Sequence, residues 1–274
     1  MKLKLVDLRI EYLKNPIGLD VKKPRFSWKL VSNEKNILQV AYRIVVAKNE
    51  TIVWDSDKRV SNTSVLVDYD GIELEAQSIY TVNVQVWDNK GNKASVEGRF
   101  ETGLLKGSNF DADWITHELA AEETACPIFV KEFRVEKEIE KVRMYATALG
   151  VYEIKINGEK VGDTFFAPGW TNYKQRLQYQ TYIVENKLQT QNKIEVTVGN
   201  GWYKGIFGLS CTPNHYGDRV AALAELHITY TDGSSEIIKT NESWTVTTGS
   251  IRSSEIYMGE TFDSTFRESI EHSA

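Results

Sequence analysis

Short stretches in which apolar and polar residues alternate, separated by turn residues, recur along the whole chain. In the first third they are Leu3–Ile10, Arg25–Leu30, Gln39–Ala47, Thr51–Trp54, Ser64–Asp68, Tyr80–Trp87 and Ala94–Phe100. Alternation with a period of two is typical of a half-buried β-strand. Long stretches of helical periodicity are absent. The sequence therefore predicts an all-β protein.

The spacing of the first strands favours an immunoglobulin-like sandwich. Leu74 is followed six residues later by Tyr80 and then by alternating valines. This pattern resembles fibronectin type III domains, in which the tyrosine lies at a corner of the sandwich and bonds back to the backbone. We expect Tyr80 and Trp28 to be structural residues of this core.

A turn-rich connector, Gly103–Asp111, predicts a domain boundary, and 274 residues suffice for two cores. We expect a fibronectin type III-like domain over 1–104, a linker over 105–126 with a short Ala/Glu-rich piece at Glu118–Glu123, and a second domain over 127–274. The second domain's strands are expected at Ile128–Val135, Lys141–Ala148, Val151–Ile156, Arg176–Val184, Lys193–Val198, Ala221–Tyr230, Ser235–Thr240 and Thr245–Thr248. Hairpin signals at Asn157-Gly158 and Asp232-Gly233 suit a jelly-roll sandwich like those of carbohydrate-binding modules.

Composition excludes several classes of protein. A formal net charge of -5 argues against a nucleic-acid partner. No apolar run reaches the length of a membrane span, and no signal peptide is visible at the N-terminus. Cys126 and Cys211 are far apart in the sequence, which fits two free thiols in a reducing compartment, although a single bridge between them is the alternative. We expect a cytoplasmic protein.

The stretch 165–182 combines large aromatic residues with a turn. Pro168-Gly169 predicts the turn, and Lys174, Gln175 and Arg176 follow Trp170 and Tyr173. Flat rings beside hydrogen-bond donors suit a sugar, whose C–H faces stack on rings while its hydroxyls need polar partners. The alternative is that Phe165, Phe166 and Trp170 close one end of a sandwich as ordinary packing, which is the usual fate of large aromatic residues.

A second aromatic stretch, Gly199–Gly208, contains Trp202 and Tyr203. Its glycine spacing does not match a phosphate-binding loop, and no helical pattern follows. We expect an irregular loop that runs on to Arg219 and includes Asp218. Because the loop is partly apolar, we expect a neighbour to cover it.

Other chemistry finds little support in the sequence. The histidines lack the spacing of metal ligands, and the nucleophile motif of Ser/His/Asp hydrolases is missing. Glu260 and Asp263 form a pair of acids of the kind that glycoside hydrolysis requires. They lie close together near the end of the chain with no evident strand or helix to hold them apart, so we expect a turn or an interdomain hydrogen bond instead.

Several motifs together resemble bacterial α-L-rhamnosidases of glycoside hydrolase family 78. They are Pro168–Tyr173 with Arg176 and Gln178–Tyr182, Gly199–Gly205, Tyr216–Asp218 and Gly259–Asp263, with Pro24–Trp28 and Phe100–Gly103 in the first domain. The family hydrolyses terminal α-L-rhamnosyl bonds with inversion, using a general acid and a general base in an (α/α)6-barrel domain.

The resemblance implies that this chain is the N-terminal accessory segment of such an enzyme, which braces the missing barrel and assists substrate recognition. No catalytic residue, cofactor or metal, calcium included, is expected here. The expected partners are rhamnose-containing glycosides and the catalytic domain. The candidate substrate-binding or interdomain residues are Trp170, Tyr173, Arg176, Trp202, Tyr203 and Asp218.

Two rival interpretations remain open. One is a free-standing carbohydrate-binding module, which would bind rhamnose and lose that binding in a Trp170→Ala variant. The other is a structural or adhesive protein in which both sandwiches only mediate contacts. Repeated modules and a secretion signal would favour the latter, and neither is visible.

Overall fold

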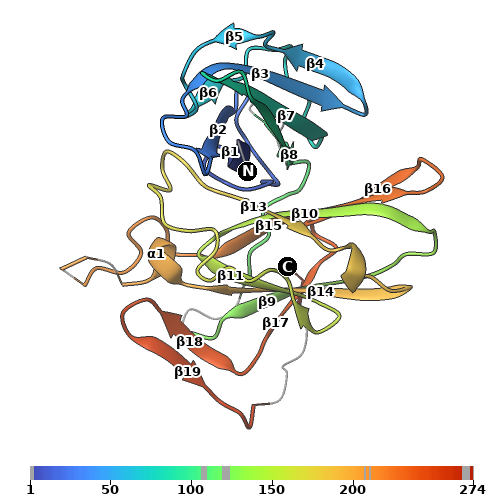
Figure 1. Ribbon diagram of the computed structural model, residues 1–274. Coiled ribbons are helices and arrows are strands. Elements are labelled where there is room, and N and C mark those ends of the chain that lie inside the picture. Colours follow the sequence, from blue (N-terminus) through green and yellow to red (C-terminus); the bar gives the residue numbers. More distant parts are fainter. Residues whose placement is uncertain are drawn as a thin grey trace. The chain divides into compact units, whose positions relative to one another are not determined.

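The computed structural model describes residues 3–105, 110–118, 124–206, 208–209, 211–266 and 272–273. The chain divides into two compact units, Met1–Asn109 and Phe110–Ala274 (Figure 1). Strands dominate both units, which confirms the all-β prediction. Over the ranges just given, no helix is long and apolar enough to cross a membrane.

The first domain is built from two antiparallel sheets, in the orders β1-β2-β6 and β4-β3-β7-β8, with β5 paired to β3. The strands are β1 (Lys4–Ile10), β2 (Arg25–Val31), β3 (Gln39–Lys48), β4 (Thr51–Asp55), β5 (Arg59–Val60), β6 (Val67–Asp68), β7 (Ile79–Asp88) and β8 (Lys93–Glu101). The alternation of the sequence appears as burial, since Val82, Val84 and Val86 of β7 all lie in the core. The expected sandwich is therefore present.

Tyr80 and Trp28 hold this core as the sequence predicted. The Tyr80 hydroxyl accepts a 2.9 Å hydrogen bond from the backbone N–H of Glu75, which is the expected bond of a tyrosine corner. The Trp28 indole N–H donates to Oε1 of Gln39 at 2.9 Å, so a buried polar group has its partner.

The second domain packs a four-stranded sheet, β13-β10-β15-β16, against a six-stranded one, β12-β11-β14-β9-β17-β20 (Figure 1). The strands are β9 (Pro127–Arg134), β10 (Ile139–Leu149), β11 (Val151–Ile156), β12 (Glu159–Lys160), β13 (Gln180–Ile183), β14 (Gln191–Gly199), β15 (Ala221–Tyr230), β16 (Ser235–Lys239), β17 (Thr245–Thr248) and β20 (His272–Ser273); a 3-10 turn, η1 (Glu185–Lys187), precedes β14. Side chains such as Met144, Ile154 and Val196 fill the space between the sheets. The result is a β-sandwich with a continuous apolar core.

Residues 110–118 belong to the second unit. The backbone N–H of Ile115 donates to the Ala222 carbonyl at 3.0 Å, the Ala222 N–H returns a bond of 2.9 Å, and Ile115 is buried in the core. The buried Glu225 carboxylate accepts the backbone N–H groups of Asp111 and Ala112. The sequence placed this stretch in the linker 105–126, because a single short bridge leaves no alternating pattern. Residues 106–109 and 119–123 of that linker, including most of the Glu118–Glu123 piece, lie outside the described residues.

The strand expected over Ser64–Asp68 is shorter, at Val67–Asp68, and two further differences bear on the second domain. The strand expected over Arg176–Val184 begins only at Gln180, because its ladder with β10 runs from Ala146↔Gln180 to Arg143↔Ile183. A separate hairpin, β18 (Ile251–Glu255) with β19 (Gly259–Phe262), was not expected at all. Neither of its strands is buried on one face, so the usual alternation of apolar residues is missing.

Candidate functional site

Two loops of the second domain carry the aromatic residues that the sequence singled out. One joins β12 to β13, and the other joins β14 to β15 and begins with the short helix α1 (Gly201–Lys204). The helix lies on the left of the domain in Figure 1, on the same side as the β18–β19 hairpin. The sequence predicted an irregular loop here, because four residues are too few to show helical periodicity.

The first loop is held by its turn. The carbonyl of Ala167 accepts the backbone N–H of Tyr152 at 2.8 Å, which ties the loop to β11. Gly169 has φ of +95°, a conformation that favours glycine. The Tyr173 hydroxyl donates to the Gly169 carbonyl at 3.2 Å. These contacts fix the backbone on both sides of Trp170.

The second loop is held by a carboxylate on β18. Oε1 of Glu255 accepts a bond of 2.6 Å from Nδ2 of Asn200, and its Oε2 accepts the Ile206 N–H at 3.1 Å. Gly201 has φ of +55° and lies so close to Val151 that an added Cβ would come within 2.7 Å of its Cγ1. The helix that presents Trp202 and Tyr203 is therefore fixed at both ends.

The two loops meet through their rings. Trp170 stacks on Trp202 with 6.3 Å between centroids and 19° between planes, and Phe166 contacts Trp202 at 5.9 Å. Tyr173 contacts Tyr203 at 5.4 Å and Tyr216 at 5.0 Å. We call this group the aromatic surface; its members are Phe166, Trp170, Tyr173, Trp202, Tyr203 and Tyr216.

These rings do not close the end of the sandwich as packing. Phe166 is 60% exposed and Trp170 is 54% exposed, and the neighbouring Phe165 is 76% exposed. The alternative in which Phe165, Phe166 and Trp170 are simply buried is therefore wrong. Tyr173 is the better covered ring, and burial, together with the neighbouring Tyr216, raises its pKa to about 12.

The remaining two candidates are exposed residues of the same two loops. Arg176 has an exposed side chain, and its backbone N–H donates to the Asn172 carbonyl at 2.9 Å, which completes a turn. Asp218 is exposed, and its charge adds to burial in raising the pKa of Tyr203. Next to Asp218 in the sequence, Gly217 allows a close approach of Tyr203, since an added Cβ would lie 2.2 Å from the Tyr203 hydroxyl oxygen.

Sequence reasoning missed three contributors. Phe166 was named only in the packing alternative and was not among the candidate residues, Tyr216 was noted only as part of a weak motif, and Glu255 was not considered. Tyr216 could have been found, because it adjoins the Gly217-Asp218 pair that the family resemblance already highlighted. Glu255 had no local signal, since its role depends on a hairpin that the pattern did not predict.

Other chemistry is sparse in the described part of the chain. No group of three or more His, Cys, Asp or Glu side chains there could hold a metal ion. Cys126 is buried and Cys211 exposed, and both are free thiols, so the alternative of a bridge between them is wrong. Glu260 lies on β19, contrary to the expectation that no strand holds it, whereas Asp263 caps the next turn by accepting the Thr265 N–H at 2.8 Å.

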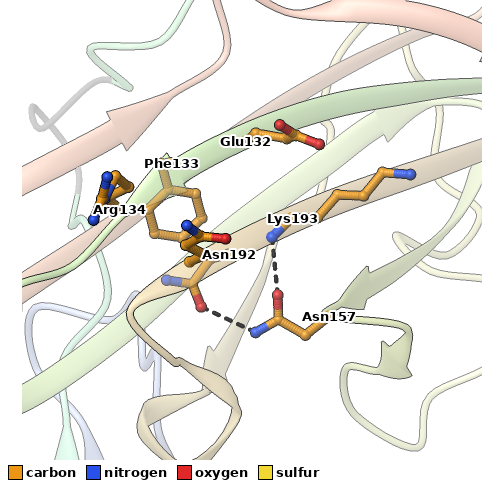
Figure 2. Close-up of a pocket in the computed structure, with 7 residues that line it drawn as sticks. Glu132, Phe133, Arg134, Asn157, Asn192 and Lys193 are labelled. Carbon is orange, nitrogen blue, oxygen red and sulfur yellow. Dashed lines mark hydrogen bonds between the residues drawn. The ribbon is translucent and has the colours of Figure 1, made fainter.

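A cavity of about 470 Å³ at the far end of the six-stranded sheet has a structural explanation (Figure 2). Asn157 in the β11–β12 turn donates from Nδ2 to Oδ1 of Asn192 at 3.0 Å and accepts the Lys193 backbone N–H at 2.9 Å. Asn192 in turn accepts the Gln189 N–H at 2.8 Å. These amides bond to the chain itself and brace the hairpin.

Comparison with known proteins gives consistent matches. Residues 137–271 match the family model "Alpha-L-rhamnosidase N-terminal domain", and residues 5–106 match "Rha78A-like, N-terminal immunoglobulin domain". An α-L-rhamnosidase of Formosa agariphila is 37% identical over 272 residues, which cover 92% of this chain and 29% of that protein.

Solved structures agree with this. The α-L-rhamnosidase of Streptomyces avermitilis, solved with L-rhamnose, superposes with a TM-score of 0.89 at 25% identity, covering 95% of this chain and 42% of that one. The α-L-rhamnosidase of Aspergillus terreus gives 0.88 at 36% identity, covering 96% and 31%. The chain thus spans well under half the length of the relatives that it matches.

Proposed function

Because residues 5–106 and 137–271 belong to the families of N-terminal domains found in α-L-rhamnosidases, we propose that this chain is the accessory, non-catalytic segment of such an enzyme. The whole enzyme would hydrolyse terminal α-L-rhamnosyl bonds. Its reacting carboxylates would then lie outside the matched region. That region covers only 29% of the Formosa agariphila protein.

The aromatic surface is the contact that this segment would offer to the catalytic part. The observation that carries the proposal is the Trp170–Trp202 stack, in which Trp170 is fixed by the loop backbone and yet 54% exposed. The nearby hairpin adds Tyr257, Met258 and Phe262, each at least 60% exposed. Clustered exposed apolar side chains mark an interaction surface, and tryptophan and tyrosine are both enriched among the residues that contribute most to such contacts.

The fixed backbone conformation of the two loops supports the same function. A docking surface binds best when its side chains are already ordered, since less conformational entropy is lost on contact. Glu255 fixes α1 and the Tyr152–Ala167 bond fixes the first loop. The two loops would therefore meet the catalytic part as one preformed surface.

A chimera tests this proposal. The present chain replaces the matching N-terminal segment of the Formosa agariphila enzyme, and hydrolysis of an aryl α-L-rhamnoside is measured beside the purified 274-residue chain. We expect turnover from the chimera and none from the chain alone. Turnover by the pure chain would refute the non-catalytic assignment.

The docking surface is tested by Trp170→Ala combined with Trp202→Ala. In the chimera we expect a loss of about 2 kcal/mol or more of interdomain stability, as for the central residues of an interface. In the isolated chain the same variant should unfold close to the wild type, because Trp170 is already half exposed. An equal effect in both settings would place the rings in local packing and contradict the docking role.

A further inference from the structure

The outer face of the six-stranded sheet holds two adjoining cavities beside the β18–β19 hairpin, of about 240 Å³ and about 320 Å³. Cys126, Lys155, Thr197 and Ile251 line both of them. Lys155 and Thr197 alternate along β11 and β14 with core residues such as Ile154 and Val196, so they form the outward-facing floor. The hairpin thus encloses a trough over a polar sheet face.

The smaller cavity has a mixed lining. Phe165 and Phe166 line it from one loop, and Ser254 and Glu260 line it from the hairpin. Phe165 is 76% exposed, with Nζ of Lys160 lying 4.4 Å from its ring centroid. The lining of the smaller cavity therefore combines apolar ring surface from one loop with a hydroxyl and a carboxylate from the hairpin.

The charges around the smaller cavity balance. Two carboxylates, Glu153 and Glu260, face two ammonium groups, Lys155 and Lys160. Glu153 and Lys160 form an ion pair at 2.6 Å. An anionic ligand would be opposed by the carboxylates and a cationic one by the lysines. A wholly apolar ligand would strip water from the charged groups without replacing their hydrogen bonds.

A neutral ligand rich in hydroxyls avoids each of these costs. A hydroxyl both donates and accepts, so it can meet a carboxylate, an ammonium group and a threonine at once. Pockets of this kind bind through apolar walls and a few convergent polar groups. Cys126 adds only apolar floor here, because burial raises the pKa of its thiol to about 11 and keeps it protonated.

We propose that this trough is a binding site for a neutral saccharide, with a sugar ring against Phe165 and its hydroxyls on Glu260, Ser254 and Lys155. The site adjoins the aromatic surface, because Phe166 lines the smaller cavity and also contacts Trp202, but neither Trp170 nor Trp202 lines either cavity. It rests on the proposed function only for the choice of a rhamnoside as the probe.

The test is calorimetric titration of the 274-residue chain with methyl α-L-rhamnoside. We expect saturable binding in the millimolar range that weakens at least about tenfold in Phe165→Ala, which removes the ring surface, and in Glu260→Gln, which replaces the charged acceptor with a neutral amide. Glu242→Gln is the matched control, because Glu242 is an exposed glutamate that does not line either cavity. Its binding should equal that of the wild type. Thermal unfolding of each variant shows that the fold is kept.

Three results would overturn the site. They are absence of saturable binding, binding that both trough variants retain, and binding lost on Trp170→Ala but kept in Phe165→Ala. The last would place sugar on the aromatic surface and favour a carbohydrate-binding module. Glucuronic acid as a second probe should bind more weakly than the neutral rhamnoside, and tighter binding of the acid would contradict the charge argument. None of these outcomes bears on turnover by the chimera, so the two proposals fail separately.

Discussion

The Tyr152 hydroxyl donates a 2.7 Å hydrogen bond to Oε1 of Gln180, and this pair connects the core to the aromatic surface. From the same amide, Nε2 donates to the Pro168 carbonyl at 3.1 Å. Tyr152 is buried on β11, whereas Pro168 lies in the turn that presents Trp170. One amide side chain therefore links a fixed strand to the loop that carries an exposed ring.

Gln180→Ala should loosen this turn with little effect on the core. The Pro168 carbonyl loses its donor, at a cost of about 1 kcal/mol. The Tyr152 hydroxyl keeps an alternative acceptor, since the Ala146 carbonyl lies 3.0 Å away. We expect acrylamide to quench tryptophan fluorescence more strongly as Trp170 leaves Trp202. Gln175→Ala, which changes an exposed glutamine of the same loop, should leave quenching unchanged.

Glu255→Ala should release α1 from the hairpin. The variant removes the carboxylate oxygen that accepts from Asn200 Nδ2 and the one that accepts from the Ile206 N–H. The loss of charged hydrogen bonds costs about 1–3 kcal/mol. We expect faster amide hydrogen exchange over residues 200–206 and a lower midpoint of urea unfolding. Glu242→Ala, at an exposed glutamate, supplies the comparison. Unchanged exchange over α1 would show that Glu255 does not hold the helix.

Most of the fold was readable from local patterns. Alternation located the long strands because each buries one face, as on β7, where Val82, Val84 and Val86 point inward. The Leu74–Tyr80 spacing predicted a bond to the backbone that the structure contains. Such features depend on neighbours within a few residues, which is the range that a sequence pattern reports.

The aromatic surface was only partly readable. The two loops were identified by their rings and glycines, yet the Trp170–Trp202 stack joins residues 32 positions apart (202 − 170), and no local pattern reports such a contact. The exposure of the rings could not be predicted either, because the identity of an aromatic residue does not tell whether its side chain is buried. The β18–β19 hairpin was not predicted, because both of its faces are partly exposed to solvent and its sequence therefore lacks the alternation of apolar residues.

Tyr80→Phe should destabilise the first domain selectively. The partly buried Glu75 N–H loses its acceptor in a corner where Tyr80 is only 2% exposed, and the lost hydrogen bond costs about 1 kcal/mol. The ring that stacks on Phe100 at 5.1 Å is retained, so packing is preserved. Hydrogen exchange should show faster opening of β7 and β8, with β10 and β15 unaffected. Equal acceleration in both domains would argue against a local effect.

Alkaline pH should weaken the second domain through Tyr173. Burial and Tyr216 raise the pKa of its hydroxyl from 10.0 to about 12, so the folded chain holds a proton that the unfolded chain has already released between those values. The stabilisation that this group contributes is therefore complete below pH 10 and falls as the pH rises towards 12.

The variant Tyr173→Phe tests this, with urea unfolding measured from pH 9 upward. We expect its stability to decline less steeply with pH than that of the wild type. Tyr257→Phe, at an exposed hairpin residue, should follow the wild-type curve. If Tyr173→Phe declines as steeply as wild type, the hydroxyl of Tyr173 is not a source of the alkaline loss.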